Sequence, residues 1–434
     1  MKHASGPALE QAPPIFVPLR FFLSLPLFGF MAAVILIAAG PDALLRRWAP
    51  VTLALTHLMT LGFITMAMIG AMLQMMPVVA GSPIWRPRLV SFVVHSLLCL
   101  GVVALAGGLW LDHTGLLWLA LFMLAMGLIF FIAIITLSLV RSRVCSPTVT
   151  GMRMAIVSLT VTLAFGLRIG AEHIWQFQTP VVHLWTDVHL AWALIGWVGL
   201  LVISVAYEVV PMFQLTPLYP AWMQRWLSKL MIAVLVLWTG VYLLAMPGWL
   251  LTLLGLCMAA ALICFAATTL YLQSHRRRRR SDVTMGFWRI GMLSLLASVF
   301  LWISGQFLPA LAAWPHYDLL LGATYIAGFA VSVINGMLYK VVPFLVWFHL
   351  QSRHIGQTGL PTVKEIIPDH RKRRQMLFHL SALVSLVAAI IWPEWFAYAA
   401  GILFAVSFLL LAFNLFAASR TYLQTKASLD DPMA

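Results

Sequence analysis

The sequence GFITMAMIGAMLQMMP, residues 62–77, decides the fold because two later stretches repeat its spacing. They are GWVGLLVISVAYEVVP at 196–211 and GFAVSVINGMLYKVVP at 328–343, and both align with it without gaps. Each stretch starts with a glycine followed by an aromatic residue and ends with a proline. Such self-similarity indicates an internal repeat. We therefore predict three equivalent units, in which the glycine allows close helix approach and the proline ends or kinks a helix.

Apolar windows surround these stretches along nearly the whole chain. Of 434 residues, 62% are hydrophobic and 9% charged, whereas a soluble protein has about 25% charged residues. A helix needs about 20 apolar residues to cross a bilayer. Twelve spans are predicted, at 17–40, 50–79, 90–111, 115–140, 152–175, 182–213, 228–246, 248–273, 286–309, 318–349, 377–392 and 394–417.

The predicted fold is therefore an all-α polytopic membrane protein with about twelve transmembrane helices. We expect one transmembrane domain over 1–434, built from three pseudo-symmetric four-helix units at about 15–140, 152–273 and 286–417. Residues 1–14 and 420–434 are expected to form flexible cytoplasmic ends, because each lies outside an apolar window.

The net charge of +14 has a topological explanation. Basic residues gather in the loops after even-numbered spans, at Arg86, Arg88, Arg141, Arg143, Arg225, Lys229, Arg276–Arg280 and 371–374. The positive-inside rule then puts both termini in the cytoplasm. We expect a multi-pass protein of a bacterial inner membrane whose partner is the lipid bilayer, and no nucleic-acid partner.

A polar residue stands three positions before each repeat proline. These residues are Gln74, Glu208 and Lys340. Charged groups inside a membrane are costly unless they are paired or hydrated. One hypothesis is a contact between Glu208 and Lys340, with Gln74 nearby, that lines a polar route from the cytoplasm. The alternative is that Lys340 snorkels to the interface and Glu208 caps a helix end.

Histidines at one depth suggest a buried metallocofactor, since neutral imidazole is a common ligand of metals and of heme iron. His57 and His189, on the second and sixth spans, are the strongest candidates, and His183 lies close to His189. Further candidate metal ligands in the outer third or outer loops are His113, His173 and His316. The alternative for each is a hydrogen-bonded side chain in a hydrated vestibule.

Arg168 lies on the fifth span, four residues before Glu172. It could pair with Glu172 or hold a heme propionate through charge-assisted hydrogen bonds.

Five methionines crowd the second span, at Met66, Met68, Met72, Met75 and Met76. Thioethers can pass Cu(I), and they also fill irregular cores. The sequence contains no phosphate-binding loop, nucleophile elbow or HExxH motif, so hydrolase and nucleotide-driven classes find no support.

The stretches THLMTLGFITMAMIGAMLQMMPVVAG at 56–81 and DVHLAWALIGWVGLLVISVAYEVVPMF at 187–213 give the chain a family resemblance. With its twelve spans in three units, it resembles the heme–copper oxidase subunit I superfamily, in its divergent NnrS-like branch. The resemblance implies heme b within the membrane domain. It places His57 where oxidases ligate the low-spin heme, and His189 where they bind copper.

The chain departs from the oxidases where oxygen is reduced. The seventh span has no His-His pair, and the tenth offers Leu321, Ala323 and Tyr325 in place of an HxH motif. We therefore do not expect a terminal oxidase or a standard nitric oxide reductase. The expected function is a heme b protein that senses, binds or removes nitric oxide or a related species, with a respiratory electron donor or quinol as a further partner.

Two other functions fit the sequence. One is a copper or heme transporter or assembly factor for respiratory enzymes, with the methionines, Glu208 and Lys340 along its pathway. The other is a structural relative that holds no cofactor.

Overall fold

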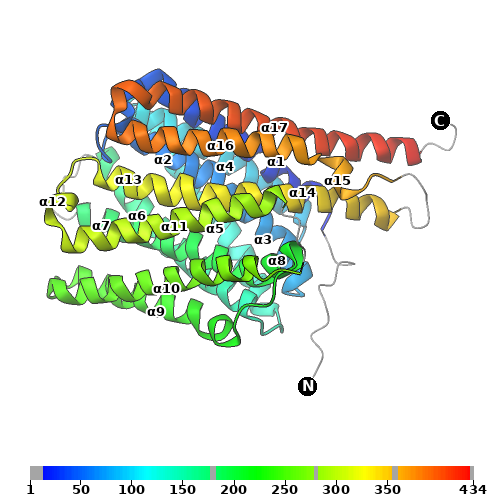
Figure 1. Ribbon diagram of the computed structural model, residues 1–434, viewed down its shortest axis with the longest axis horizontal. Coiled ribbons are helices and arrows are strands. Elements are labelled where there is room, and N and C mark those ends of the chain that lie inside the picture. The colour runs from blue at the N-terminus through cyan, green and yellow to red at the C-terminus, as the bar shows by residue number, and fades with distance from the viewer. Residues whose placement is uncertain (1–12, 176–181, 278–281, 354–359, 431–434) are drawn as a thin grey trace. The chain divides into compact units, whose positions relative to one another are not determined.

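The computed structural model describes residues 13–175, 182–277, 282–353 and 360–430 (Figure 1). All regular structure within these ranges is helical. It forms twelve segments that are long and apolar enough to cross a membrane: Phe16–Leu44, Pro50–Val79, Pro87–Trp110, Thr114–Arg141, Pro147–Trp175, Val182–Gln214, Ala221–Leu243, Gly248–Ser274, Val283–Phe307, Tyr317–Ser352, Asp369–Ile391 and Pro393–Ser428. The predicted all-α polytopic fold is confirmed.

The described chain divides into two compact units. The first unit comprises residues 71–279 and 295–314 of the helical region. Its helices are α4 (Pro87–Trp110), α5 (Thr114–Arg141), α6 (Pro147–Trp175), α7 (Val182–Ala191), η4 (Trp192–Gly199), α8 (Leu200–Gln214), α9 (Ala221–Leu243), α10 (Gly248–Ser274) and α12 (Pro309–Ala312).

The second unit comprises residues 15–70, 280–294 and 315–434. Its helices are α1 (Phe16–Ala39), η2 (Gly40–Leu44), α2 (Pro50–His57), η3 (Leu58–Thr65), α13 (Tyr317–Ala323), η5 (Thr324–Val331), α14 (Ser332–Arg353), α15 (Val363–Ile366), α16 (Asp369–Ile391) and α17 (Pro393–Asp430). Two helices, α3 (Met66–Val79) and α11 (Val283–Phe307), contribute residues to both units.

Prolines mark where several helices begin. Proline occupies the first position of α2, α4, α6 and α17. The first backbone N–H groups of a helix have no partner within it, so the missing N–H of proline costs little there. The repeat prolines Pro77, Pro211 and Pro343 behave differently, because α3, α8 and α14 continue past them. Of the two alternatives expected for these prolines, the helix end is therefore wrong, and the kink stays a prediction.

Three π-helical segments occupy the same place in the three repeats. η3, η4 and η5 begin at Leu58, Trp192 and Thr324, each 19 residues before the repeat proline, and each is eight residues long. The repeat glycines Gly62, Gly196 and Gly328 are the fifth residue of their segments. A shared register is what an internal repeat predicts. Because π-helices are rare and are frequently found at functional sites, these segments are candidates for the functional centre.

The repeat glycines allow close helix contact, as expected. A Cβ atom added at any of them would lie 2.6–2.7 Å from a side chain on the helix that precedes it in the same predicted four-helix unit. The residues approached are Phe28 on α1, Ser158 on α6 and Ser294 on α11. Any side chain at these glycines would therefore push two helices apart.

In the first unit, sequence neighbours pack as pairs. α4 packs on α5, and α9 packs on α10. Figure 1 shows α9 and α10 side by side. Gly151 near the start of α6 lies directly against Ser204 of α8. The hydroxyl of Ser204 also lies 3.3 Å from that of Ser228 on α9. Small residues thus bring α6, α8 and α9 together.

In the second unit, the first and last spans pack together. α17 lies beside both α1 and α16 (Figure 1). A Cβ at Gly29 would lie 2.6 Å from the ring of Phe408, so α1 approaches α17 closely. The two units therefore cut across the predicted repeat limits, because helices of the first and third repeats share one compact unit.

The C-terminal region differs from the expectation. Residues 420–430 continue α17 as a helix, although 420–434 were expected to be flexible. The reason is packing, since Tyr422 is buried and its ring lies 6.0 Å from that of Phe16. Residues 1–12 and 431–434 lie outside the described residues, so the expectation of flexible ends stays a prediction for them.

Candidate functional site

His57 lies in the second unit, as the last residue of α2 before the π-helix η3. Its side chain is partly buried, and its Nδ1 atom lies 2.8 Å from the carbonyl oxygen of Leu53. A carbonyl oxygen only accepts, so Nδ1 of the neutral ring must donate and Nε2 carries the lone pair. This is the arrangement by which proteins fix the tautomer of a metal-binding histidine.

His189 lies in the first unit, three residues before η4. Its Nδ1 atom donates to the carbonyl oxygen of Thr162 on α6, at 2.9 Å. Gly166, one turn further along α6, makes room for the ring, because a Cβ atom there would lie 2.9 Å from Cε1 of His189. The imidazole is therefore held between two helices, with Nε2 as the unprotonated nitrogen.

Arg168 and Glu172 form the ion pair predicted from their spacing, with 2.6 Å between Nη2 and Oε1. The Glu172 side chain is buried, whereas that of Arg168 is 51% exposed. A buried carboxylate requires such a partner. Arg168 is therefore the ion-pair partner of Glu172. A role of its half-exposed guanidinium in binding a heme propionate stays a prediction.

The remaining candidate histidines take separate positions. His183 and His173 are exposed, and His113 is exposed and caps α5 by accepting a hydrogen bond from the backbone N–H of Leu116. His316 Nδ1 donates to the carbonyl oxygen of Leu44 at 3.2 Å. Within the described ranges no three His, Cys, Asp or Glu side chains gather to hold a metal ion. The structure therefore does not bring His113, His173 and His316 together as such a group.

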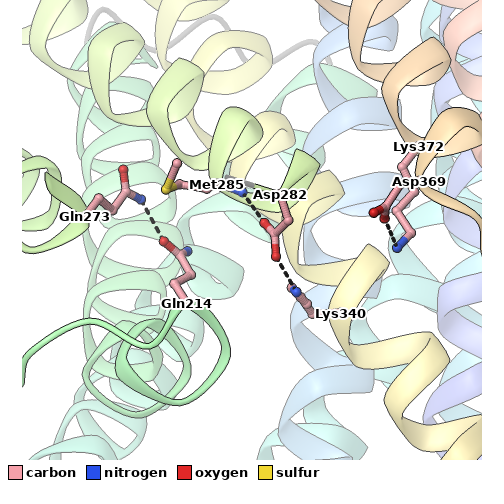
Figure 2. A network of polar contacts seen from close by, with 7 residues as sticks. All are labelled: Gln214, Gln273, Asp282, Met285, Lys340, Asp369 and Lys372. Atoms are coloured by element: carbon pink, nitrogen blue, oxygen red, sulfur yellow. Dashed lines mark hydrogen bonds and ion pairs between the residues drawn. The ribbon is translucent and has the colours of Figure 1, made fainter. Parts of the chain in front are cut away.

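Two of the three polar residues before the repeat prolines have partners within their own units. Lys340 forms an ion pair with Asp282, which immediately precedes α11, with 2.5 Å between Nζ and Oδ2 (Figure 2). Glu208 accepts a hydrogen bond of 3.4 Å from the hydroxyl of Thr148, at the start of α6. Thr148 lies at the beginning of α6, the first helix of the second predicted four-helix unit, to which Glu208 also belongs. Asp282 lies immediately before α11, the first helix of the third predicted unit, to which Lys340 belongs.

This placement favours the capping interpretation for Glu208, because a carboxylate near a helix N-terminus is stabilised there. Gln74 is partly buried, and its Oε1 atom has no hydrogen-bond partner among the described residues. Glu208 and Lys340 belong to different units, so the predicted contact between them stays a prediction. Asp282 was not predicted as a partner of Lys340 because it lies in a connecting segment.

The methionines of the second span behave as core residues. Met66, Met68, Met72 and Met76 are buried, and Met75 is partly buried. Flexible packing explains their number, so the structure adds no support for copper passage along them.

A second group of polar residues was not predicted as a site. It lies in the second unit on α14, α16 and α17 and includes the buried His379. The available signal was the spacing of Ser332, Asn335 and Tyr339 on one face of an apolar helix.

The sequence matches no protein-family model, and a search of the curated proteins finds no match. Function is therefore inferred from the chain's own residues, and membership of a family stays a proposal.

Proposed function

We propose that this membrane-embedded helical protein binds heme b through His57, in the manner of the heme–copper oxidase superfamily, and acts on or senses nitric oxide or a related species. The observation that carries the proposal is the position and tautomer of His57. It presents Nε2 from an apolar span, directly before a π-helix. When bound, heme would supply an iron centre that takes up a small gaseous ligand.

His189 also has an unprotonated Nε2 atom that could bind iron, in its own unit. Its ring is held through Nδ1, and a glycine provides the space beside it. Arg168 adds a half-exposed guanidinium in that unit, suited to a propionate. We propose His189 as a second iron ligand independent of His57, and a bacterial inner membrane with both termini cytoplasmic as the location.

A copper centre is not part of this proposal, since among the described residues no group of three ligands is formed. Copper or heme transport likewise gains no specific support from the buried methionines.

The test is an optical spectrum of detergent-purified protein, oxidised and dithionite-reduced, with pyridine hemochrome and metal analysis. His57→Ala and His189→Ala are compared with His275→Ala, which changes an exposed histidine bonded to Tyr271 and Ser274. We expect a heme b signal in the wild type and the control, reduced in one or both of the other variants.

Adding nitric oxide or carbon monoxide to the reduced protein then shows whether the iron has an open position. A folded protein without Soret absorption, even after heme supplementation, would refute the proposal. A heme signal unchanged in both histidine variants would refute the assignment of the ligands.

A further inference from the structure

The second unit contains buried polar side chains on one face of α14. Ser332, Asn335 and Tyr339 stand at positions i, i+3 and i+7, so they line the same side of the helix. All three are buried, and Asn335 is 0% exposed. An amide in this position is costly unless its polar atoms find partners.

A matching stripe runs along α16 from its first residue. Asp369, Lys372, Gln375 and His379 follow one another at about one-turn intervals. The Asp369 side chain is 63% exposed and accepts a hydrogen bond of 3.0 Å from the largely buried ammonium of Lys372 (Figure 2). Gln375 and His379 are both 0% exposed. The stripe thus leads from an exposed carboxylate to a fully buried imidazole.

Hydrogen bonds connect the two stripes and α17. The Ser332 hydroxyl lies 2.8 Å from Nε2 of His379, Gln375 Nε2 donates to the Ser407 hydroxyl at 3.0 Å, and Asn414 Nδ2 donates to the Tyr339 hydroxyl at 2.9 Å. We call these residues, with Asn335, Asp369 and Lys372, the polar ladder.

Several atoms of the polar ladder lack a protein partner. Both amide atoms of Asn335, Oε1 of Gln375 and Nδ1 of His379 have no hydrogen-bond partner among the described residues. Leaving a buried polar group unsatisfied costs about 1–3 kcal/mol. Internal water satisfies such groups in proteins, with about three hydrogen bonds for each molecule. Donors and acceptors in neighbouring turns of packed helices provide the partners that water needs.

We propose that the polar ladder is a water-filled path that begins at Asp369 and Lys372 and ends at His379 and Ser332. Ser332 is the first residue after the π-helix η5, so the path leads to the π-helical region of this unit. Water along it gives the His379 imidazole, which can hold a proton on either nitrogen, a route for proton exchange with solvent at the beginning of α16. This inference does not depend on heme binding.

Thiol accessibility tests the path, because a thiol must ionise in contact with water before it reacts. Ser332→Cys and Ser407→Cys are close in size to the native residues and lie on the polar ladder. Ala330→Cys and Ala412→Cys are controls, since both alanines are buried within a few residues of the serines. The four native cysteines, Cys99, Cys145, Cys257 and Cys264, are first replaced by alanine.

The full-length protein in lipid nanodiscs is treated with silver ion, quenched, denatured and alkylated with a maleimide. We expect silver to protect the cysteines at 332 and 407 several-fold faster than those at 330 and 412. Equal rates at ladder and control positions would overturn the proposal.

A second measurement covers the case in which a cysteine variant fails to fold. Asn335→Leu keeps the volume and removes the amide. If water satisfies the amide, the variant loses those hydrogen bonds and its unfolding midpoint falls. If the site holds no water, the substitution instead removes an amide that has no hydrogen-bond partner, and the protein becomes no less stable. An unchanged or raised unfolding midpoint would therefore overturn the proposal. Neither readout involves heme, so failure here is separate from failure of the proposed function.

Discussion

Replacing Gly62 with alanine should destabilise the protein relative to the same change at Gly322. A Cβ at Gly62 would lie 2.6 Å from Cγ of Phe28 and 2.7 Å from its Cβ and Cδ1, whereas carbon atoms prefer about 3.5–4.0 Å. Phe28 is buried, and its Cβ is fixed to the backbone of α1, so the clash requires the two helices to move apart. At Gly322 the added Cβ meets nothing within 4 Å.

The magnitude follows from two opposing terms. Alanine is favoured over glycine in a helix by about 1 kcal/mol, and this gain applies at both positions. Overpacking of a well-packed core costs about 1–3 kcal/mol, and this cost applies only at Gly62. The propensity term cancels in the comparison, so Gly62→Ala should be less stable than Gly322→Ala by about 1–3 kcal/mol.

The assay is unfolding of both purified variants and the wild type in detergent, with the free energy of unfolding taken from denaturant titration. Combining Gly62→Ala with Phe28→Ala should cost less than the sum of the two single changes, because Phe28→Ala removes Cγ and Cδ1 from the contact. Equal stability of the two glycine variants would refute the close approach of α1 to η3.

Three further predictions concern single positions. Tyr242→Phe removes the 2.6 Å hydrogen bond to the Asp187 carboxylate and should lower the free energy of unfolding by about 1.5–3 kcal/mol, measured by denaturant titration. A Cβ atom added at Gly240 meets no neighbour within 4 Å. Gly240→Ala should therefore raise the free energy of unfolding by up to about 1 kcal/mol in the same assay. The hydrogen bonds that Thr362 donates lower the pKa of Glu365 below its usual value, so the capping of α15 is present above about pH 4 and is lost as the pH falls through that lowered pKa. Hydrogen exchange of the α15 amides, corrected for intrinsic rates, should show this loss in the wild type and not in Glu365→Gln.

The number and approximate limits of the spans could be predicted because a bilayer requires long apolar helices whose backbone groups pair internally. The errors occur where helices continue beyond the apolar window. The span predicted from 377 begins at Asp369, two residues before the basic run 371–374, and the last helix continues to Asp430. Hydropathy detects the part of a helix that crosses the membrane and does not detect a polar continuation of it.

The candidate site could be predicted only in part. His57 and His189 are recognisable as histidines in apolar spans, and Arg168 with Glu172 from helical spacing. The tautomer of His189 was not predictable, because its acceptor lies on another helix, 27 residues away. The polar ladder was also missed, since single polar residues in apolar helices become a cluster only when their faces meet.

The sequence by itself determined the membrane class, the twelve spans and the shared spacing of the three repeat stretches, since these depend on composition and on distance along one chain. Only the tertiary structure decided that Lys340 pairs with Asp282, 58 residues away, and that Ser332 meets His379. Such pairings depend on how each helix is rotated about its axis and which neighbour it packs against. In a uniformly apolar chain, hydropathy carries little information about that rotation.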